Sequence, residues 1–327
     1  MVTLAPDPAL VGRISAELDR IAGPESTLGI AVSGGPDSLA LLLLAAAARP
    51  GKVEAATVDH ALRPESAREA EMVAGVCKTL SVPHAILTVE WKRKPDTAIQ
   101  ELARAARYRL LARWVADRGL SALVTAHHLD DQVETLLMRL NRGSGARGLA
   151  GMRRAAPLPV PGSNARLLRP LLGWRRLDLE GVCKAAKLKP VEDPSNSDEQ
   201  FERIRVRRGL AGADWLDPQG IARSAANLAS ADVALHWAVD KEWESQVSRT
   251  ESEIIYRPAA PLEIRRRIVR RAVAALAREG KGNIVRGREL DGLVAALASG
   301  RKATLRGVLC TGGEQWRFSP APRRRRA

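Results

Sequence analysis

Short apolar runs alternate with longer amphipathic segments over roughly the first two hundred residues. The apolar runs occupy residues 28–32, 53–58, 84–89 and 122–126. The segments that follow them carry apolar residues at helical spacing and occupy residues 39–48, 65–80, 97–118 and 130–141. Strands that alternate with helices of this length predict βαβ units, which build a parallel sheet covered by helices on both faces.

The pattern changes after about residue 200. Apolar residues then recur at helical spacing in 220–247, 261–278 and 286–298, and strand-like pieces follow at 302–309 and 315–318. We therefore predict three parts. They are an N-terminal α/β domain (1–210), a mostly helical C-terminal domain (211–319) and a basic, disordered tail (320–327).

Charge and cysteine content narrow the class of protein. Lys and Arg number 52 against 37 Asp and Glu, so the net charge of +15 favours a polyanionic partner, nucleic acid before an acidic membrane surface. Cys77, Cys183 and Cys310 are too far apart to predict a disulfide framework or a CxxC metal pair, which fits a reducing compartment such as the cytoplasm. The N-terminus lacks a signal-peptide pattern, and the longest apolar run (39–48) is too short to span a bilayer.

The segment SGGPDS lies between the first predicted strand and the first predicted helix. It consists of Ser33, Gly34, Gly35, Pro36, Asp37 and Ser38. Its glycines allow a tight turn and close approach of a ligand to the backbone, and the helix N-terminus presents N–H groups to an anion. It matches neither GxxxxGK[ST] nor GxGxxG. The alternative is a plain strand-to-helix turn capped by Asp37 or Ser38.

Two histidines and three carboxylates gather where the fourth predicted strand meets its helix. They are His127, His128, Asp130, Asp131 and Glu134. The helix dipole stabilises carboxylates in a first turn, but capping needs fewer of them. Such a cluster can hold Mg²⁺, position an amine or shuttle protons, and it is too rich in oxygen for structural zinc. A glycine- and arginine-rich segment (139–152) follows, which we expect to be a mobile basic loop or a solvated linker.

Six segments, in this order and spacing, resemble the tRNA(Ile)-lysidine synthetase family of PP-loop ATP pyrophosphatases. They are SGGPDS (33–38), VDHALR (58–63), ELARAARY (101–108), HHLDDQVETLLMRLNRGSGARGLAGM (127–152), LLRPLL (167–172) and EDPSNSDEQFERIRVR (192–207). The resemblance implies a Rossmann-like, adenine nucleotide alpha hydrolase-like fold. It also implies a cytoplasmic ligase that uses ATP to adenylate the C2 oxygen of the wobble cytidine in the CAU anticodon of tRNA(Ile), releasing pyrophosphate. Free L-lysine then displaces AMP to give lysidine, so that the codon read changes from AUG to AUA and the amino acid charged from Met to Ile.

The resemblance also implies roles for individual residues. Residues 33–38 would hold the phosphates of ATP, with Asp37 and Asp131 as candidate Mg²⁺ ligands. Arg107 and His127 would serve adenylation, and Asp131 and Glu134 would receive the amino groups of lysine. The arginines expected near the tRNA are Arg142, Arg147, Arg203, Arg205 and Arg207. Ile204 stands where the family usually has asparagine, which removes any side-chain hydrogen bond expected there.

Further arginines favour a basic surface for tRNA in the C-terminal domain. One predicted helix carries Arg265, Arg266, Arg267, Arg270 and Arg271. Together with the arginines of the segment 139–154, they would form one surface leading to SGGPDS; the alternative is a merely soluble basic surface with charges scattered around the domain. The sequence leaves open whether the protein is a homodimer.

Three alternatives differ in what they require. A tRNA thiolase of the same superfamily needs a sulfur-carrying cysteine or a cysteine-held iron–sulfur cluster, and the three cysteines form no close pair in sequence. An amidotransferase-type synthetase such as GMP synthetase needs a glutaminase domain or partner. A non-catalytic RNA-binding protein would have no need of intact SGGPDS and HHLDDQVET segments.

Overall fold

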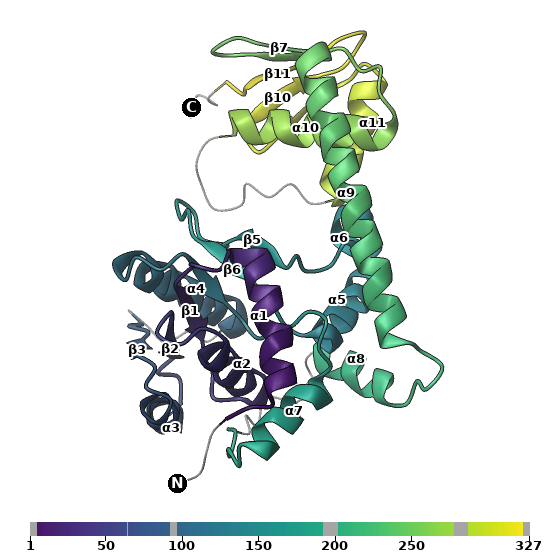
Figure 1. Cartoon of the computed structure of the whole chain (residues 1–327). Helices are drawn as coiled ribbons and strands as arrows, with labels where there is room; N and C mark the ends of the chain where they lie inside the picture. Colours follow the sequence, from purple (N-terminus) through teal and green to yellow (C-terminus); the bar gives the residue numbers. More distant parts are fainter. Residues whose placement is uncertain (1–4, 64, 92–96, 192–201, 278–286, 323–327) are drawn as a thin grey trace. The chain divides into compact units, whose positions relative to one another are not determined.

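The computed structural model describes residues 5–63, 65–91, 97–191, 202–277 and 287–322, which form two compact units (Figure 1). Unit 1 comprises the described residues up to Gly143 and those from Gly148 to Ala226; unit 2 comprises Ser144–Arg147 and the described residues from Asn227 onward. The units divide inside helix α9 (Pro218–Gln246), whereas the sequence placed the domain boundary at 210. A helix that continues through a boundary carries no turn signal there, because its hydrogen bonding is unbroken.

Unit 1 is built on a six-stranded sheet in the order β3-β2-β1-β4-β6-β5. The strands are β1 (Leu28–Ala31), β2 (Val53–Asp59), β3 (His84–Thr88), β4 (Ala122–Val124), β5 (Ala155–Pro157) and β6 (Arg166–Leu168). All neighbours pair in parallel except β5, which runs antiparallel to β6 at the edge. The four strands expected from the apolar runs are therefore confirmed as the parallel part of an α/β sheet, and β6 joins them.

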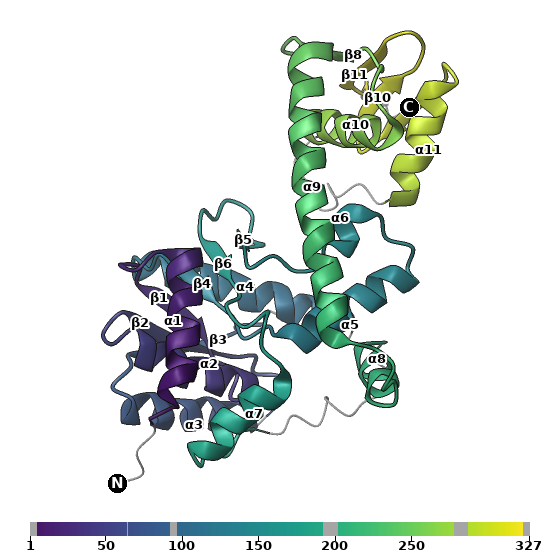
Figure 2. The same ribbon diagram turned by 45° about the vertical axis from the view of Figure 1, so that its right-hand side comes forward.

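Helices cover both faces of this sheet, as the strand–helix alternation predicted (Figures 1 and 2). The helices of unit 1 are α1 (Pro8–Ala22), α2 (Pro36–Ala48), α3 (Glu65–Thr79), α4 (Ile99–Asp117), α5 (Leu129–Asn141), α7 (Arg176–Ala185) and α8 (Glu202–Ala211), while α6 (Ala146–Leu149) spans the division between the units. Side chains of α1, α2, α3 and α7 pack with Leu28 and Ile30 on one face, and α4 packs with Leu123 on the other. Successive side chains of a strand point to opposite faces of the sheet, so strand residues that meet one layer of helices alternate with residues that meet the other.

Helix α2 shows why a helix can be apolar all round. Residues 38–45 are all buried, because the helix lies between the sheet on one side and α1 and α7 on the other. The sequence reading missed α1. It begins at a proline after Asp7, whose side chain accepts the N–H of Ala9, and it buries Ile14, Leu18 and Ile21.

Unit 2 combines helices α9, α10 (Leu262–Leu276) and α11 (Gly287–Ala298) with a five-stranded antiparallel sheet. The order is β7 (Val247–Arg249), β8 (Ile254–Tyr256), β11 (Trp316–Pro320), β10 (Val308–Thr311) and β9 (Lys302–Leu305). The helical C-terminal region is confirmed, but the sheet is larger than the two strand-like pieces indicated. The piece 302–309 is a hairpin, since Arg306 and Gly307 both adopt positive φ and turn the chain in two residues.

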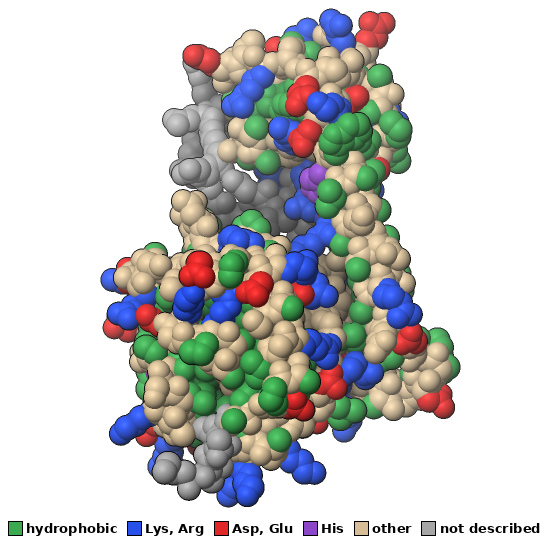
Figure 3. Space-filling model, in the orientation of Figure 1, with side chains coloured by type: hydrophobic (Ala, Val, Ile, Leu, Met, Phe, Trp, Pro, Cys, Tyr) green, Lys and Arg blue, Asp and Glu red, His purple; other side chains and the backbone are tan. Residues whose placement is uncertain are grey.

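The structure bears on two further expectations for unit 2, the tail and the arginines of α10. Pro320 ends β11, pairs with Val308 and is therefore part of the sheet; the arginine run of the expected disordered tail (323–326) lies outside the described residues. Three of the five α10 arginines are ion-paired inside the unit, so part of the expected positive charge is neutralised there, while a continuous surface with the segment 139–154 stays a prediction. Arg266 pairs with Asp291, Arg267 with Asp232 and Arg271 with Asp240. Figure 3 likewise shows acidic side chains interspersed among the Lys and Arg side chains on the face drawn. No helix in the described parts of the chain is long and apolar enough to cross a membrane.

Candidate active site

The SGGPDS loop leaves the carboxyl end of β1 and opens α2. Gly34 has φ +84°, a conformation that favours glycine, and a Cβ at this position would crowd Val191 Cγ2 at 3.0 Å. The Gly34 carbonyl accepts the N–H of Val191 at 2.9 Å. Gly35 is the N-cap of α2, and no side chain caps the helix.

The two serines of the loop hold its shape. Ser38 Oγ accepts the N–H of Ser33 at 3.1 Å, donates to the Gly35 carbonyl at 3.0 Å and lies 3.2 Å from Ser33 Oγ. Neither Asp37 nor Ser38 acts as the cap that the alternative interpretation required. The helix N-terminus is therefore left without a side-chain acceptor, which suits an anion.

Asp37 lies in the first turn of α2, and its two carboxylate oxygens differ. Oδ2 lies 3.5 Å from His128 Nε2. Oδ1 is buried and has no hydrogen-bond partner among the described residues. A buried carboxylate oxygen without a partner costs stability, so this atom fits a cation that a ligand brings.

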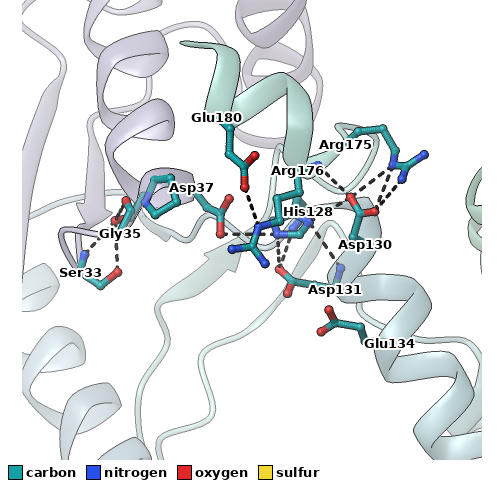
Figure 4. Close-up of polar contacts among 12 residues, drawn as sticks. Ser33, Gly35, Asp37, His128, Asp130, Asp131, Glu134, Arg175, Arg176 and Glu180 are labelled. Atoms are coloured by element: carbon teal, nitrogen blue, oxygen red, sulfur yellow. Dashed lines mark hydrogen bonds and ion pairs between the residues drawn. The ribbon is translucent and has the colours of Figure 1, made fainter. Parts of the chain in front are cut away.

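His128 links the loop to the acidic cluster, within which the sequence analysis assigned it no role of its own (Figure 4). It is 1% exposed, and its ring nitrogens lie 3.5–3.6 Å from oxygens of Asp37, Asp130 and Asp131. Burial alone would lower its pKa, but the three carboxylates outweigh burial and raise the pKa to about 9. The Asp131 carboxylate also accepts the backbone N–H of His128 at 3.0 Å, which holds the two residues together at the start of α5.

Asp130 has a structural role, although the sequence grouped it with the other acids. Its carboxylate accepts the backbone N–H of Arg176 at 2.8 Å. It also forms an ion pair with Arg175, with 3.0 Å between Arg175 Nη2 and Asp130 Oδ1. Burial would raise its pKa, but His128 and these donors hold the pKa well below its ordinary value. Asp130 therefore joins α5 to α7 and stays ionised.

Asp131 and Glu134 are the acids expected to receive lysine, and we call them the acid pair. Both form ion pairs with arginines of α8. Arg203 contacts Asp131 through Nη2 and Glu134 through Nε, both at 2.6 Å, and Arg207 Nε contacts Glu134 at 2.7 Å. Glu134 is only 2% exposed. Burial raises the pKa of Asp131 in spite of His128 and Arg203. Two arginines expected near tRNA thus lie on the expected lysine site.

Arg104, Arg107 and Arg169 form a cationic group around His127, where β4 and β6 end. His127 Nδ1 is 2.9 Å from Thr125 Oγ1, and its pKa falls to about 3 because of burial and then of surrounding arginines, of which Arg169 and Arg107 contribute most. His127 is therefore neutral. Arg169 is 8% exposed and forms no ion pair with the described residues; its Nη1 donates to the Arg153 carbonyl at 2.8 Å, and its Nε has no hydrogen-bond partner there.

The ring of Tyr108 packs against two arginines of this cationic group. The guanidinium groups of Arg104 and Arg107 lie 5.0 and 5.1 Å from its ring centroid. Its hydroxyl is buried and has no hydrogen-bond partner within the described part of the chain. Sequence reasoning missed Tyr108 and Arg169 as site residues, although an arginine inside the apolar run LLRPLL was a signal for the latter.

The segment after α5 is more constrained than its glycines suggested. Gln132 binds both backbone groups of Met152, accepting N–H at 2.7 Å and donating to the carbonyl at 3.1 Å. Arg139 donates to the carbonyls of Gly148 and Gly151. Residues 148–152 are therefore attached to α5.

The arginines expected near tRNA are distributed over both units. Arg142 pairs with Glu202 of α8, and Arg147 belongs to unit 2. Arg205 lies on α8 together with Arg203 and Arg207. Contacts between these side chains and tRNA stay a prediction.

Comparison with known proteins gives consistent matches. The PP-loop domain family matches residues 11–213. The tRNA(Ile)-lysidine synthase of Novosphingobium aromaticivorans is 47% identical over 304 residues, which is 92% of this chain and 91% of that protein. The tRNA(Ile)-lysidine synthase of Zymomonas mobilis is 43% identical over 303 residues, covering 92% and 90%.

Among solved structures, the U34-tRNA thiolase NcsA from Methanococcus maripaludis with its [4Fe-4S] cluster is similar in fold. The TM-score is 0.55 at 14% sequence identity, over 67% of this chain and 78% of that chain. The cysteines differ from what a thiolase needs. Cys77, Cys183 and Cys310 are all buried, and burial raises the pKa of each thiol to about 11 or 12, so each stays protonated.

Proposed function

The chain belongs to the tRNA(Ile)-lysidine synthase family of PP-loop proteins, and on that premise we propose that it ligates lysine to the C2 position of the wobble cytidine in tRNA(Ile). ATP adenylates the C2 oxygen and pyrophosphate leaves. The amine of lysine then forms the C–N bond as the C–O bond to AMP breaks. The CAU anticodon then reads AUA instead of AUG, and the tRNA is charged with Ile instead of Met. The observation that carries this proposal is His128, which contacts both Asp37 of the anion-binding loop and Asp131 of the acid pair.

The loop supports the role expected for residues 33–38 in holding the phosphates of ATP. The uncapped N-terminus of α2 offers N–H donors and the positive end of the helix dipole. Mg²⁺ fits Asp37, whose Oδ1 has no partner in the described chain, together with phosphate oxygens and water. Asp131 fits the metal less well, because Arg203 and the His128 N–H already occupy its two oxygens. When bound, Mg²⁺ would neutralise phosphate charge and polarise the reacting phosphoryl group.

The cationic group at the ends of β4 and β6 supports the adenylation role expected for Arg107 and His127. Negative charge builds on the phosphate oxygens as the cytidine oxygen attacks, and fixed positive charges in a buried site stabilise it. Arg169 and Tyr108 have buried donors without partners among the described residues, so binding an anion there satisfies groups that folding left unpaired. A neutral His127 can accept or donate a hydrogen bond without adding repulsion to these cations.

The acid pair supports the second step. Lysine carries two ammonium groups, and the one that attacks must lose a proton. Glu134 is suited to holding an ammonium, since it is 2% exposed and its present partners are cations. Asp131, whose pKa burial raises, is the better acceptor for the proton.

The experiment is to incubate the full chain with ATP, Mg²⁺, isotopically labelled lysine and a tRNA(Ile) transcript, then to digest the RNA and measure the anticodon nucleoside by mass spectrometry. Labelled lysidine is the expected product, and reactions without ATP or with an anticodon lacking the wobble cytidine are the controls. Release of pyrophosphate without a modified cytidine would assign the chain to another PP-loop reaction. The homodimer and the cytoplasmic location stay predictions.

A further inference from the structure

Helix α8 is attached to α5 by charged side chains. Arg203 and Arg207 contact the acid pair on the inner part of α5, and Glu202 pairs with Arg142 just beyond its end. No residue of α8 is fully buried, although α8 and α5 pack side by side. These ion pairs therefore contribute to the attachment of α8 to α5, together with apolar side chains of α8 that are only partly exposed.

The arginines of α8 occupy the positions that an ammonium group would need. Arg203 and Arg207 together contact both oxygens of Glu134, and Arg203 also takes Oδ1 of Asp131. A lysine molecule that reached this site would have to displace two guanidinium groups from a buried carboxylate. The paired arrangement is therefore closed to free lysine.

We propose that Arg203 and Arg207 keep the Asp131–Glu134 pair closed to lysine until tRNA phosphates draw them away, so that lysine enters the site after tRNA. The inference rests on the proposed function and adds an order of binding to it. Guanidinium groups bind phosphate as well as carboxylate with two parallel hydrogen bonds, so an RNA backbone on α8 competes directly with the two acids. The order has a chemical benefit: an amine held beside ATP before the cytidine is adenylated could attack the nucleotide itself.

The test is equilibrium dialysis of labelled lysine against the full chain, without nucleotide, in the presence and absence of tRNA(Ile). The wild type is expected to bind lysine about tenfold or more tightly when tRNA is present, the range expected when a charge-assisted hydrogen bond becomes available. The double variant Arg203→Gln, Arg207→Gln is expected to reach the tighter affinity without tRNA. The variant Arg207→Lys keeps a cation at the acid pair and is expected to stay closed.

The matched control is Arg118→Gln, which removes an arginine bound through two contacts to Glu54 elsewhere in unit 1. It should leave lysine binding unchanged. If the double variant fails to give a cooperative melting curve, Arg207→Gln alone, which leaves the two Arg203 contacts in place, is measured instead. Its expected gain is smaller but in the same direction.

Two results would overturn the inference alone: equal lysine affinity of the wild type with and without tRNA, or weaker lysine binding in the glutamine variant, which would make the arginines positioning residues. Failure of the proposed function looks different. In that case the wild type forms no lysidine with ATP and tRNA, and lysine binds in neither state.

Discussion

Two buried arginines, one in each unit, show how the same side chain serves different purposes. Arg267 in unit 2 is 6% exposed and lies between Asp232 and Glu263, at 2.7 and 2.8 Å. Burial would lower its pKa, but these acids raise it. Arg169 in unit 1 is 8% exposed, has no acid as a partner in the described chain, and burial lowers its pKa.

The difference separates a charge that the fold neutralises from one that the fold leaves for a ligand. A buried ion pair is complete without any other molecule, and removing one partner leaves the other uncompensated. A buried cation surrounded by other cations is costly in the free protein and becomes favourable when an anion arrives. We therefore expect Arg267 to matter for folding and Arg169 for activity.

The largest expected effect is on stability in unit 2. Replacing Arg267 by glutamine should lower the free energy of unfolding by about 3 kcal/mol, because the buried Asp232 loses the guanidinium group that lies 2.7 Å from it. Chemical denaturation of the full chain measures this. The control Arg271→Gln breaks an exposed pair with Asp240 and should cost at most about 1 kcal/mol. Equal losses in the two variants would contradict the role of burial.

The next effect is on turnover in unit 1. Asp37→Asn should lower lysidine formation at least about 100-fold while the melting curve stays native. The loop conformation depends on Gly34 and the two serines, whereas we propose that the carboxylate serves the ATP phosphates and Mg²⁺. Asp117→Asn, in an exposed pair with Arg113, is the matched control. Near-normal turnover of the Asp37 variant would remove this residue from the reaction.

The variant Arg169→Gln tests the comparison directly. We expect formation of adenylated tRNA to fall about 10- to 100-fold with no loss of stability, since the arginine has no partner acid to strand. The measurement pairs an assay of adenylated tRNA with denaturation. A loss of stability as large as that of Arg267→Gln would show that Arg169 is structural after all.

The smallest effect is expected for Glu134→Gln, which should raise the lysine concentration needed for half-maximal rate about tenfold and change adenylation less. The substitution keeps the size of the side chain and removes the charge that offsets an ammonium. Separate assays of adenylated tRNA and of lysine incorporation distinguish the steps. Equal losses in both would mean that Glu134 does not discriminate between them.

Local sequence signals predicted much of unit 1 and less of unit 2. Alternating apolar runs identified β1 to β4. The glycines of SGGPDS identified a tight loop, and the positive φ of Gly34 shows why this loop favours glycine there. Strands β4, β5 and β6 have three residues each. Strand β4 was identified because it begins the longer run 122–126, whereas arginine or proline interrupts the apolar runs of β5 and β6. The first two strands of unit 2 are equally short, so its sheet was underestimated.

The sequence by itself indicated candidate site residues such as Asp37, Asp131 and Glu134, and tertiary structure decided what those residues contact. Loops, caps and amphipathic faces depend on residues a few positions apart, so they can be read along the chain. The ion pairs of Glu134 with Arg203 and Arg207 join residues 69 and 73 positions apart. The absence of an acid beside Arg169 is equally a matter of packing. Because a charged side chain acts through its nearest neighbours in space, only the packed chain distinguishes an arginine that closes a site, one that stabilises the fold and one that is left for a ligand.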